Sequence, residues 1–306
     1  VNEIDRHGYN ERLFLGTIAA GGTLGILIPP SIVMIVYGAL TETSIPQLYL
    51  AGIIPGIVLA VLFMATVIIA CLIRPAWGGD KISLSSSERW RTLPDLIPPL
   101  IIFIVVIGSI YSGLATPTES AALGVLMAII LTAFQRSLNW KMLADSIEGT
   151  VRTSSMIMLI LIGATFLSFV LTSVGIGRQV TGLITESGLS PMHTMWMLIG
   201  LYLILGMFME SLSMMIATVP IITPVVVGMG FDPVWFGVLM MLLLETALIT
   251  PPVGVNLFIV QGVRERGQIR DVMIGSLPFV VTLLAMIVLL VVFPDLALWL
   301  PHALSG

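Results

Sequence analysis

The sequence predicts an all-α integral membrane protein, an inverted-repeat fold with broken helices and a re-entrant hairpin. Hydrophobic residues make up 57% of the 306 positions and charged residues only 10%, and the mean hydropathy is +1.09. A soluble domain carries about 25% charged residues. This chain has too few charges to cover a surface in water, so we expect it to fold in a lipid bilayer. Its single cysteine, Cys71, excludes an intrachain disulfide bond.

The chain also nearly repeats itself with an offset of about 222 residues, the distance from Pro29 to Pro251. Each copy holds a Pro-Pro pair inside an apolar run, at Leu27–Val33 and at Ile249–Val255. Shorter matches flank the pairs in nearly the same register: Gly8-Tyr9-Asn10 with Gly230-Phe231-Asp232, Phe14 with Phe236, and Gly52–Pro55 with Gly275–Pro278. Interrupted helices at corresponding positions of two halves are typical of a transporter's binding site.

Nine apolar runs follow one another along the chain, and several reach the roughly 18 residues that span a bilayer. Proline and glycine punctuate many of them, which transmembrane helices tolerate when neighbouring helices satisfy the freed backbone groups. We expect helices over all nine runs, with the first and the eighth interrupted: Leu13–Leu40, Leu48–Ile73, Leu96–Tyr111, Ala121–Phe134, Ser154–Val174, Met192–Met209, Met214–Met229, Val234–Val263 and Val272–Phe293.

The positions of the basic residues predict the membrane topology. Twelve of the 13 Lys and Arg residues fall on one face if Met192–Met209 and Met214–Met229 enter and leave on the same side. The positive-inside rule makes that face cytoplasmic and places residues 294–306 outside. We therefore expect a re-entrant hairpin over Met192–Met229 with its tip, Glu210–Ser213, near the midplane. Two full spans joined by a short cytoplasmic turn are the alternative.

Three segments between the runs are more polar. Arg136–Arg152 is predicted to be an amphipathic stretch along the cytoplasmic interface, a depth that suits Trp140 and Lys141. A similar position on the outer side is expected for Gly175–Gly188. Ile82–Leu93 contains three consecutive serines and is predicted to be a cytoplasmic linker between the two halves.

The two Pro-Pro pairs are the predicted centre of function. Each pair removes two amide donors, and its rings clash with the preceding turn, so the helix must stop. The helix that ends there points carbonyl oxygens and a negative dipole end into the gap, which attracts Na⁺. The helix that restarts points amides and a positive end there, which attracts a carboxylate. A simple proline kink is the structural alternative.

Glycines and threonines around the breaks would let the backbone approach an ion and add hydroxyl oxygens. The hairpin tip would supply two serines from the other side, unless it is an ordinary polar turn. The candidate sodium ligands are Gly22, Thr23, Gly25, Pro29, Ser211, Ser213, Thr246, Thr250 and Pro251. The candidate substrate-binding residues are Pro30, Ser31, Gly206, Gly254 and Asn256, the last of which could instead pack between helices.

Glu245 follows the apolar run Met240–Leu244 and precedes the second break. A carboxyl group inside a membrane is costly and is a functional candidate by default. It could pair with a basic residue, anchor a helix end or sense a proton; a structural role is favoured because the small and hydroxyl residues suffice for an ion.

The remaining motifs point away from enzyme chemistry. Thr116 and Glu119 have capping-box spacing at the start of a helix. No pair of the three histidines has metal-ligand spacing, and the chain has no Walker loop. An intramembrane serine hydrolase would need a buried His or Lys base, and no Lys or His lies in an apolar run away from its ends. We expect no enzyme activity and no cofactor besides the coupling ion.

Four motifs together resemble the large membrane subunit of TRAP (tripartite ATP-independent periplasmic) transporters. These motifs are Gly25–Ser31, Ala51–Gly56, Ala115–Ala121 and Thr250–Leu257. The resemblance covers essentially the whole chain. It implies an elevator-type secondary transporter in a bacterial inner membrane, driven by a Na⁺ gradient. It also implies a periplasmic substrate-binding protein, a small four-helix membrane subunit, and a small organic acid as substrate, such as a C4-dicarboxylate, a keto acid or a sugar acid like sialate.

The resemblance also implies a division into regions. Residues 1–47 would end the first-repeat transport region, 48–95 would be a scaffold helix and linker, and 96–153 scaffold helices with the interfacial segment. Residues 154–263 would form the second-repeat transport region, with the hairpin at 192–229 and the broken helix at 234–263. Residues 264–306 would be the last scaffold helix and a periplasmic end. The family's first hairpin is expected before Val1, which leaves the first sodium site incomplete in this chain.

A proton-coupled or exchange-type anion transporter with the same inverted-repeat fold is the competing interpretation. Glu245 is the residue that favours it. The two interpretations differ in whether uptake follows a Na⁺ gradient or a pH gradient.

Overall fold

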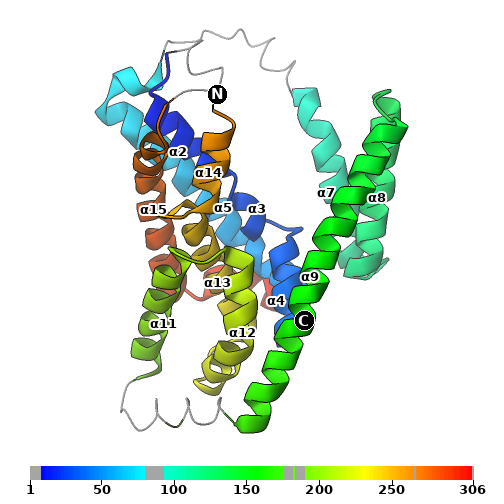
Figure 1. Cartoon of the computed structure of the whole chain (residues 1–306), viewed down its shortest axis with the longest axis vertical. Coiled ribbons are helices and arrows are strands. Elements are labelled where there is room, and N and C mark those ends of the chain that lie inside the picture. Colours follow the sequence, from blue (N-terminus) through cyan, green and yellow to red (C-terminus); the bar gives the residue numbers. More distant parts are fainter. Residues whose placement is uncertain (1–7, 80–92, 176–181, 183–189, 265–266, 305–306) are drawn as a thin grey trace. The chain divides into compact units, whose positions relative to one another are not determined.

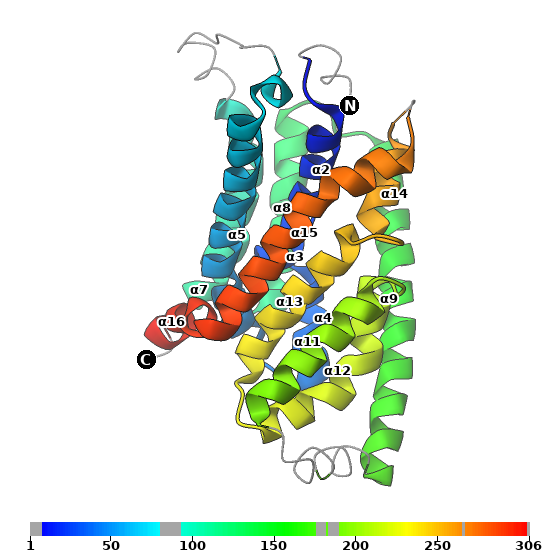
Figure 2. The same cartoon turned by 90° about the vertical axis from the view of Figure 1, so that its left-hand side faces the viewer.

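A computed structural model describes residues 8–79, 93–175, 182, 190–264 and 267–304, and its regular elements over these residues are all helical. The chain forms two compact units (Figures 1 and 2). Unit 1 consists of Val1–Lys81 and Gly163–Gly306, and unit 2 of Ile82–Ile162. The predicted linker Ile82–Leu93 and the segment Gly175–Gly188 lie almost wholly outside the described residues.

The first repeat in unit 1 contains the predicted broken helix. The Asn10 side chain caps its first part by accepting a hydrogen bond from the Leu13 amide at 3.1 Å. The helix stops before the Pro-Pro pair and restarts after Ser31, with a bend of 42° between the two parts. The elements are α2 (Glu11–Gly21), α3 (Leu24–Leu27), α4 (Ile32–Thr41), the long α5 (Ile45–Ile73) and the short 3-10 helix η1 (Pro75–Gly78).

The second repeat has the same order of elements: α13 (Pro233–Ile249), α14 (Val255–Gly262), α15 (Ile269–Val292) and α16 (Asp295–Leu304). The break falls at residues 250–254, so both predicted interruptions are confirmed. Both long helices contain a proline at equivalent positions, Pro55 in α5 and Pro278 in α15. The two repeats run in opposite directions, because α2 and α13 start from opposite ends of unit 1 (Figures 1 and 2).

The predicted hairpin consists of α11 (Pro191–Gly206) and α12 (Ser211–Gly228). The outer ends of both helices lie at the same end of unit 1, and their tip lies at mid-height beside the break after α13 (Figures 1 and 2). The tip is earlier than predicted, because residues 207–210 make the turn and Ser211 already belongs to α12. The physical reason is Glu210, whose carboxylate caps the free amides of Leu212 and Ser213.

Helix α13 forms the centre of unit 1, and every residue from Val234 to Ala247 is buried. A helix that is apolar on all sides is expected to be surrounded by other helices, and α13 packs against α5, α11, α12 and α15. Gly237 makes this packing possible on one side, because a Cβ there would lie 2.6 Å from Leu48 and 2.8 Å from Tyr37.

Helices α2 and α15, which belong to opposite repeats, cross at two glycines. A Cβ added to Gly16 would lie 1.9 Å from the carbonyl oxygen of Gly275, and one added to Gly275 would lie 1.9 Å from that of Arg12. No side chain fits between the two backbones at this point. The predicted scaffold helices α5 and α15 belong to the same compact unit as the broken helices.

Charged residues cluster at the end of unit 1 where α2 and α15 begin. The Arg264 side chain is 3% exposed and pairs with Glu11 and, at 3.8 Å, with Asp271. Arg12 pairs with Asp271 at 3.0 Å. The network connects both repeats at the end that the basic residues predict to be cytoplasmic.

We expect Arg264→Met to lower the free energy of unfolding by about 1–2 kcal/mol. The loss stays below the 3–5 kcal/mol of a fully buried pair because Glu11 and Asp271 remain partly solvated. The thermal unfolding midpoint in detergent measures the effect, with the exposed Arg270→Met as the matched control. Equal midpoints for the two variants would contradict a stabilising role for the network.

Unit 2 contains η2 (Leu93–Leu96), α7 (Ile97–Tyr111) and α8 (Pro117–Phe134), followed by the first part of α9 (Trp140–Val174). The predicted capping box is present, with the Thr116 amide donating to Glu119 at 2.8 Å and the Glu119 amide donating to the Thr116 hydroxyl at 3.4 Å. Ser109 of α7 and Ser120 of α8 join the two helices by a hydroxyl contact of 2.8 Å.

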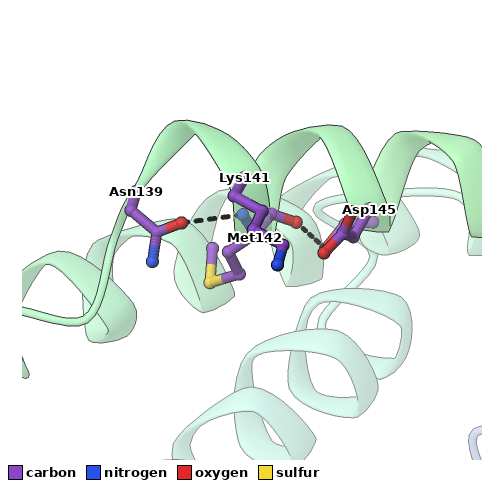
Figure 3. Close-up of a pocket in the computed structure, with 5 residues that line it drawn as sticks. Asn139, Lys141, Met142 and Asp145 are labelled. Atoms are coloured by element: carbon purple, nitrogen blue, oxygen red, sulfur yellow. Dashed lines mark hydrogen bonds between the residues drawn. The ribbon is translucent and has the colours of Figure 1, made fainter.

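The predicted amphipathic stretch over Arg136–Arg152 and the predicted helix over Ser154–Val174 are continuous in the structure, and the position of the stretch along the membrane interface stays a prediction. Asn139 caps a new helix by accepting from the Met142 amide at 2.8 Å, and α9 then continues for 35 residues to Val174. No proline lies between residues 141 and 174 to stop it. Figure 3 shows the surface hollow at this helix start, about 470 Å³ in volume, which includes none of the candidate binding residues.

Four helices in the described part of the chain are long and apolar enough to cross a membrane, or five if the bent pair α2–α4 counts as one span. They are α5, α8, α12 and α15. Large apolar side chains are also exposed at the end of α5, where Leu72 is 74% and Ile73 73% exposed. This composition is that of a multi-pass membrane protein. Because α12 alone has the length of a span, the hairpin's re-entrant nature stays a prediction.

Candidate functional site

The two helix breaks occupy equivalent places in the two repeats, and a long helix covers each of them. The last residues before the breaks are Leu27 in α3 and Ile249 in α13. A Cβ on Gly52 of α5 would lie 2.5 Å from the Leu27 carbonyl oxygen, and the Ser276 hydroxyl of α15 donates to the Ile249 carbonyl at 3.1 Å. The sequence interpretation did not assign Gly52 and Ser276 to the site, although both lie in the repeated Gly52–Pro55 and Gly275–Pro278 matches.

At the first break, Thr23 is fully buried and its hydroxyl donates to the Ala20 carbonyl at 2.8 Å. The Ser31 side chain accepts from the Met34 amide at 3.4 Å and caps α4, so its hydroxyl acts at the restarting helix as a helix cap. The other candidates differ in exposure: Pro29 is buried, whereas Gly22, Gly25 and Pro30 are exposed.

At the second break, two hydroxyls flank the end of α13: Thr246 lies in its last turn and Thr250 follows it. Thr246 donates to the Leu242 carbonyl at 2.7 Å, and Thr250 donates to the Thr246 carbonyl at 2.6 Å. Each hydroxyl oxygen keeps lone pairs that can still bind a cation. Gly254 has φ of +20°, and a Cβ there would lie 3.0 Å from the carbonyl oxygens of Leu248 and Thr250, so this position requires glycine. Pro251 is half-buried.

The hairpin tip lies against the last turns of α13. The Ser211 hydroxyl donates to the Leu244 carbonyl at 3.3 Å, and a Cβ on Gly206 would lie 2.6 Å from the Ala247 Cβ. Ser213 is exposed and its hydroxyl donates to Glu210 at 3.0 Å. Of the candidate residues in the hairpin, Gly206 and Ser211 therefore lie against α13, whereas the Ser213 side chain bonds to Glu210, the cap of α12.

Two contacts join the breaks to each other. The Thr23 hydroxyl lies 3.4 Å from Oε2 of Glu245, and the Asn256 amide donates to the Ala19 carbonyl at 3.3 Å. Both breaks and the hairpin tip therefore meet around one turn of α13, residues 244–247. Pro30, Ser31 and Ser213 have no such contact with this turn among the described hydrogen bonds.

The arrangement offers hydroxyl oxygens, carbonyl ends and close backbone approach, which suit a hard cation. Within the described residues, no group of three or more His, Cys, Asp or Glu side chains could hold a metal ion. Any ion at the breaks would thus depend on backbone and hydroxyl oxygens. The restarting helix α4 and the turn before α14 add amide ends, which suit an anion.

Comparisons with known proteins show the family of the chain. The family model "Tripartite ATP-independent periplasmic transporter, DctM component" matches residues 1–296. The chain is 33% identical to the C4-dicarboxylate TRAP transporter large permease protein DctM of Pseudomonas aeruginosa, over 98% of this chain and 70% of that protein.

Two further relatives are named for other substrates. The sialic acid TRAP transporter large permease protein SiaM of Vibrio cholerae is 31% identical over 97% of this chain and 69% of its own length. The 2,3-diketo-L-gulonate TRAP transporter large permease protein YiaN of Escherichia coli is 29% identical over 92% and 66%. These matches extend over nearly all of the residues that form the broken helices and the hairpin, and the chain therefore belongs to the DctM family of tripartite ATP-independent periplasmic transporter permeases.

Proposed function

We propose that the chain is the large permease of a Na⁺-coupled secondary transporter that imports a small organic acid. The observation that carries the proposal is the meeting of both helix breaks and the hairpin tip at residues 244–247 of α13. Oxygen atoms at the ends of α3 and α13 would bind Na⁺, with hydroxyls from Thr23, Thr246 and Thr250. The relatives' names, which include C4-dicarboxylates, sialic acid and 2,3-diketo-L-gulonate, support an acid as substrate.

The acid would bind where helices restart. Gly254 allows the tight backbone turn before α14, where a side chain would meet the Leu248 and Thr250 carbonyls, and Asn256 offers an amide beside it. Pro30 and Ser31 stand at the equivalent place in the first repeat. A cation held by carbonyl ends beside this point would offset the charge of a carboxylate, so that the pair crosses the bilayer with less cost than either ion alone.

Movement by an elevator mechanism would carry the site across the membrane. In this mechanism the broken helices and the hairpin would move against the predicted scaffold regions 48–95, 96–153 and 264–306. A re-entrant hairpin over Met192–Met229 would close the site from the other side, with its tip at the second break.

The proposed transporter works with two partners in a bacterial inner membrane. A periplasmic substrate-binding protein would deliver the acid, and a small four-helix membrane subunit would complete the complex. Residues 294–306 would face the periplasm, because the described basic residues of unit 1 lie at its opposite end, at Arg12, Arg74, Arg264 and Arg270. Much of the choice of acid would lie in the binding protein.

The test is uptake by the complete complex in proteoliposomes. We expect substrate accumulation with an inward Na⁺ gradient and none when the Na⁺ concentrations on the two sides are equal. An imposed pH gradient without Na⁺ serves as the control and should not drive uptake. Undiminished accumulation without a Na⁺ gradient would reject sodium coupling.

A proton-coupled or exchange-type anion transporter is the second candidate. Glu245 favours it, because its carboxyl group is fully buried and its Oε1 atom has no hydrogen-bond partner among the described residues. Uptake that follows a pH gradient and is lost in Glu245→Gln would support this candidate. Uptake that persists in Glu245→Gln and still requires Na⁺ would reject it.

A further inference from the structure

The contact between Thr23 and Glu245 joins residues that are equivalent in the two repeats. They are 222 residues apart, which is the same offset that superimposes Pro29 on Pro251. A residue can touch its own counterpart only where the two copies face each other. Thr23 and Glu245 therefore mark the place where the repeats meet, one turn before each break.

The contact lies in the dry interior of unit 1. Both residues are 0% exposed, and Oε1 of Glu245 has no hydrogen-bond partner in the described part of the chain. An apolar side chain of similar size would pack at this position without a buried polar atom left unsatisfied. The presence of the Glu245 carboxyl group at this buried position favours a role beyond packing.

The turn that carries Glu245 also contacts the hairpin. Residue 244 accepts a hydrogen bond from Ser211 at 3.3 Å, and Ala247 lies against Gly206. A shift of the first break that moves Thr23 must therefore displace the α13 turn on which the second break and the hairpin tip depend.

We propose that Thr23 and Glu245 form a joint that couples ion binding at the first break to ion binding at the second. Glu245 is in this sense a positioning residue, which acts through the turn 244–247 and binds no ion itself. The inference rests on the proposed Na⁺ coupling. Coupling between two ion sites appears as a Hill coefficient above one, with an upper limit of about 2 for two sites.

The experiment measures uptake against Na⁺ concentration for the complete complex in proteoliposomes. We expect a Hill coefficient above one for the wild type and about one for Glu245→Met, which removes the polar contact at similar size. Glu245→Gln should restore the wild-type coefficient, because its amide can still bond the Thr23 hydroxyl.

Two controls separate this role from simpler ones. Thr66 and Thr282 form another hydroxyl contact between the repeats, at 2.7 Å and outside the candidate site, and Thr66→Val should keep the wild-type coefficient. Binding of radioactive sodium should give the same number of bound ions for the wild type and Glu245→Met. The substitution breaks the contact between Thr23 and Glu245 but removes no ion ligand.

Four results would overturn the proposed joint while leaving Na⁺ coupling in place. The first two are a Hill coefficient of one for the wild type and an unchanged Hill coefficient in Glu245→Met. The other two are an equal decrease of the Hill coefficient in Thr66→Val and the loss of a bound ion in Glu245→Met. Wild-type uptake that ignores Na⁺ would reject the proposed function and the joint with it.

Discussion

Gly275→Val is expected to prevent the chain from folding into a stable transporter. The side chain would meet the Arg12 backbone, since even its Cβ would lie 1.9 Å from a carbonyl oxygen. Overpacking in a core usually costs about 1–3 kcal/mol because side chains can shift. Here two helix backbones would have to separate, so we expect a loss of more than about 3 kcal/mol. The yield of monodisperse protein in detergent and its thermal unfolding midpoint are the measurements.

Gly200→Ala is the matched control for this prediction. Gly200 lies within α11, and a Cβ there would meet no atom within 4 Å. Alanine should leave folding intact or raise stability slightly, because glycine inside a helix is unfavourable by roughly 0.5–1 kcal/mol. Normal yield and midpoint in Gly275→Val would show that α2 and α15 do not cross as closely as described.

Ser211→Ala and Thr250→Ala are each expected to raise the Na⁺ concentration for half-maximal uptake. Each change removes a hydroxyl oxygen at the place where the tip meets the second break. Loss of one hydrogen-bonding group typically costs about 1 kcal/mol, which corresponds to a several-fold increase, and an ion ligand should cost more. We therefore expect about a tenfold increase, equal to 1.4 kcal/mol, with a smaller effect on the maximal rate.

Ser109→Ala is the control variant for Ser211→Ala and Thr250→Ala. The Ser109 hydroxyl is buried and hydrogen-bonded to Ser120. Both serines belong to unit 2, whereas all of the candidate binding residues belong to unit 1. We expect an unchanged Na⁺ dependence. If Ser211→Ala and Thr250→Ala behave like Ser109→Ala, neither hydroxyl belongs to an ion site.

The broken helices were predictable because proline acts through covalent chemistry. A single proline can be accommodated within a helix, as Pro55 is in α5 and Pro278 in α15. Two successive prolines remove two amide donors and clash with the preceding turn, so the interruptions near Pro29 and Pro251 follow from the sequence. The capping box at Thr116 and Glu119 is likewise a local interaction between neighbours. The turn of the hairpin ends a few residues earlier than predicted, because the Glu210 carboxylate caps α12 at Ser211.

The start of α9 shows the limit of reading polarity. The stretch over residues 136–152 is polar and the next is apolar, which suggested two elements. Polarity changes the surroundings of a helix and does not stop it, and without a proline α9 continues through both. The change from polar to apolar residues near residue 153 therefore does not mark the end of a helix.

The residues alone established the membrane class, the duplicated order of helices, the two breaks and the hairpin, because these depend on composition, period and proline. Only the folded chain decided which of these parts touch. The Thr23–Glu245 contact, the cover of the Ile249 carbonyl by Ser276, and the crossing at Gly16 and Gly275 all join residues from different helices. Such contacts depend on how α13 packs between its neighbours, and a pattern along one helix holds no information about the side chain that faces it.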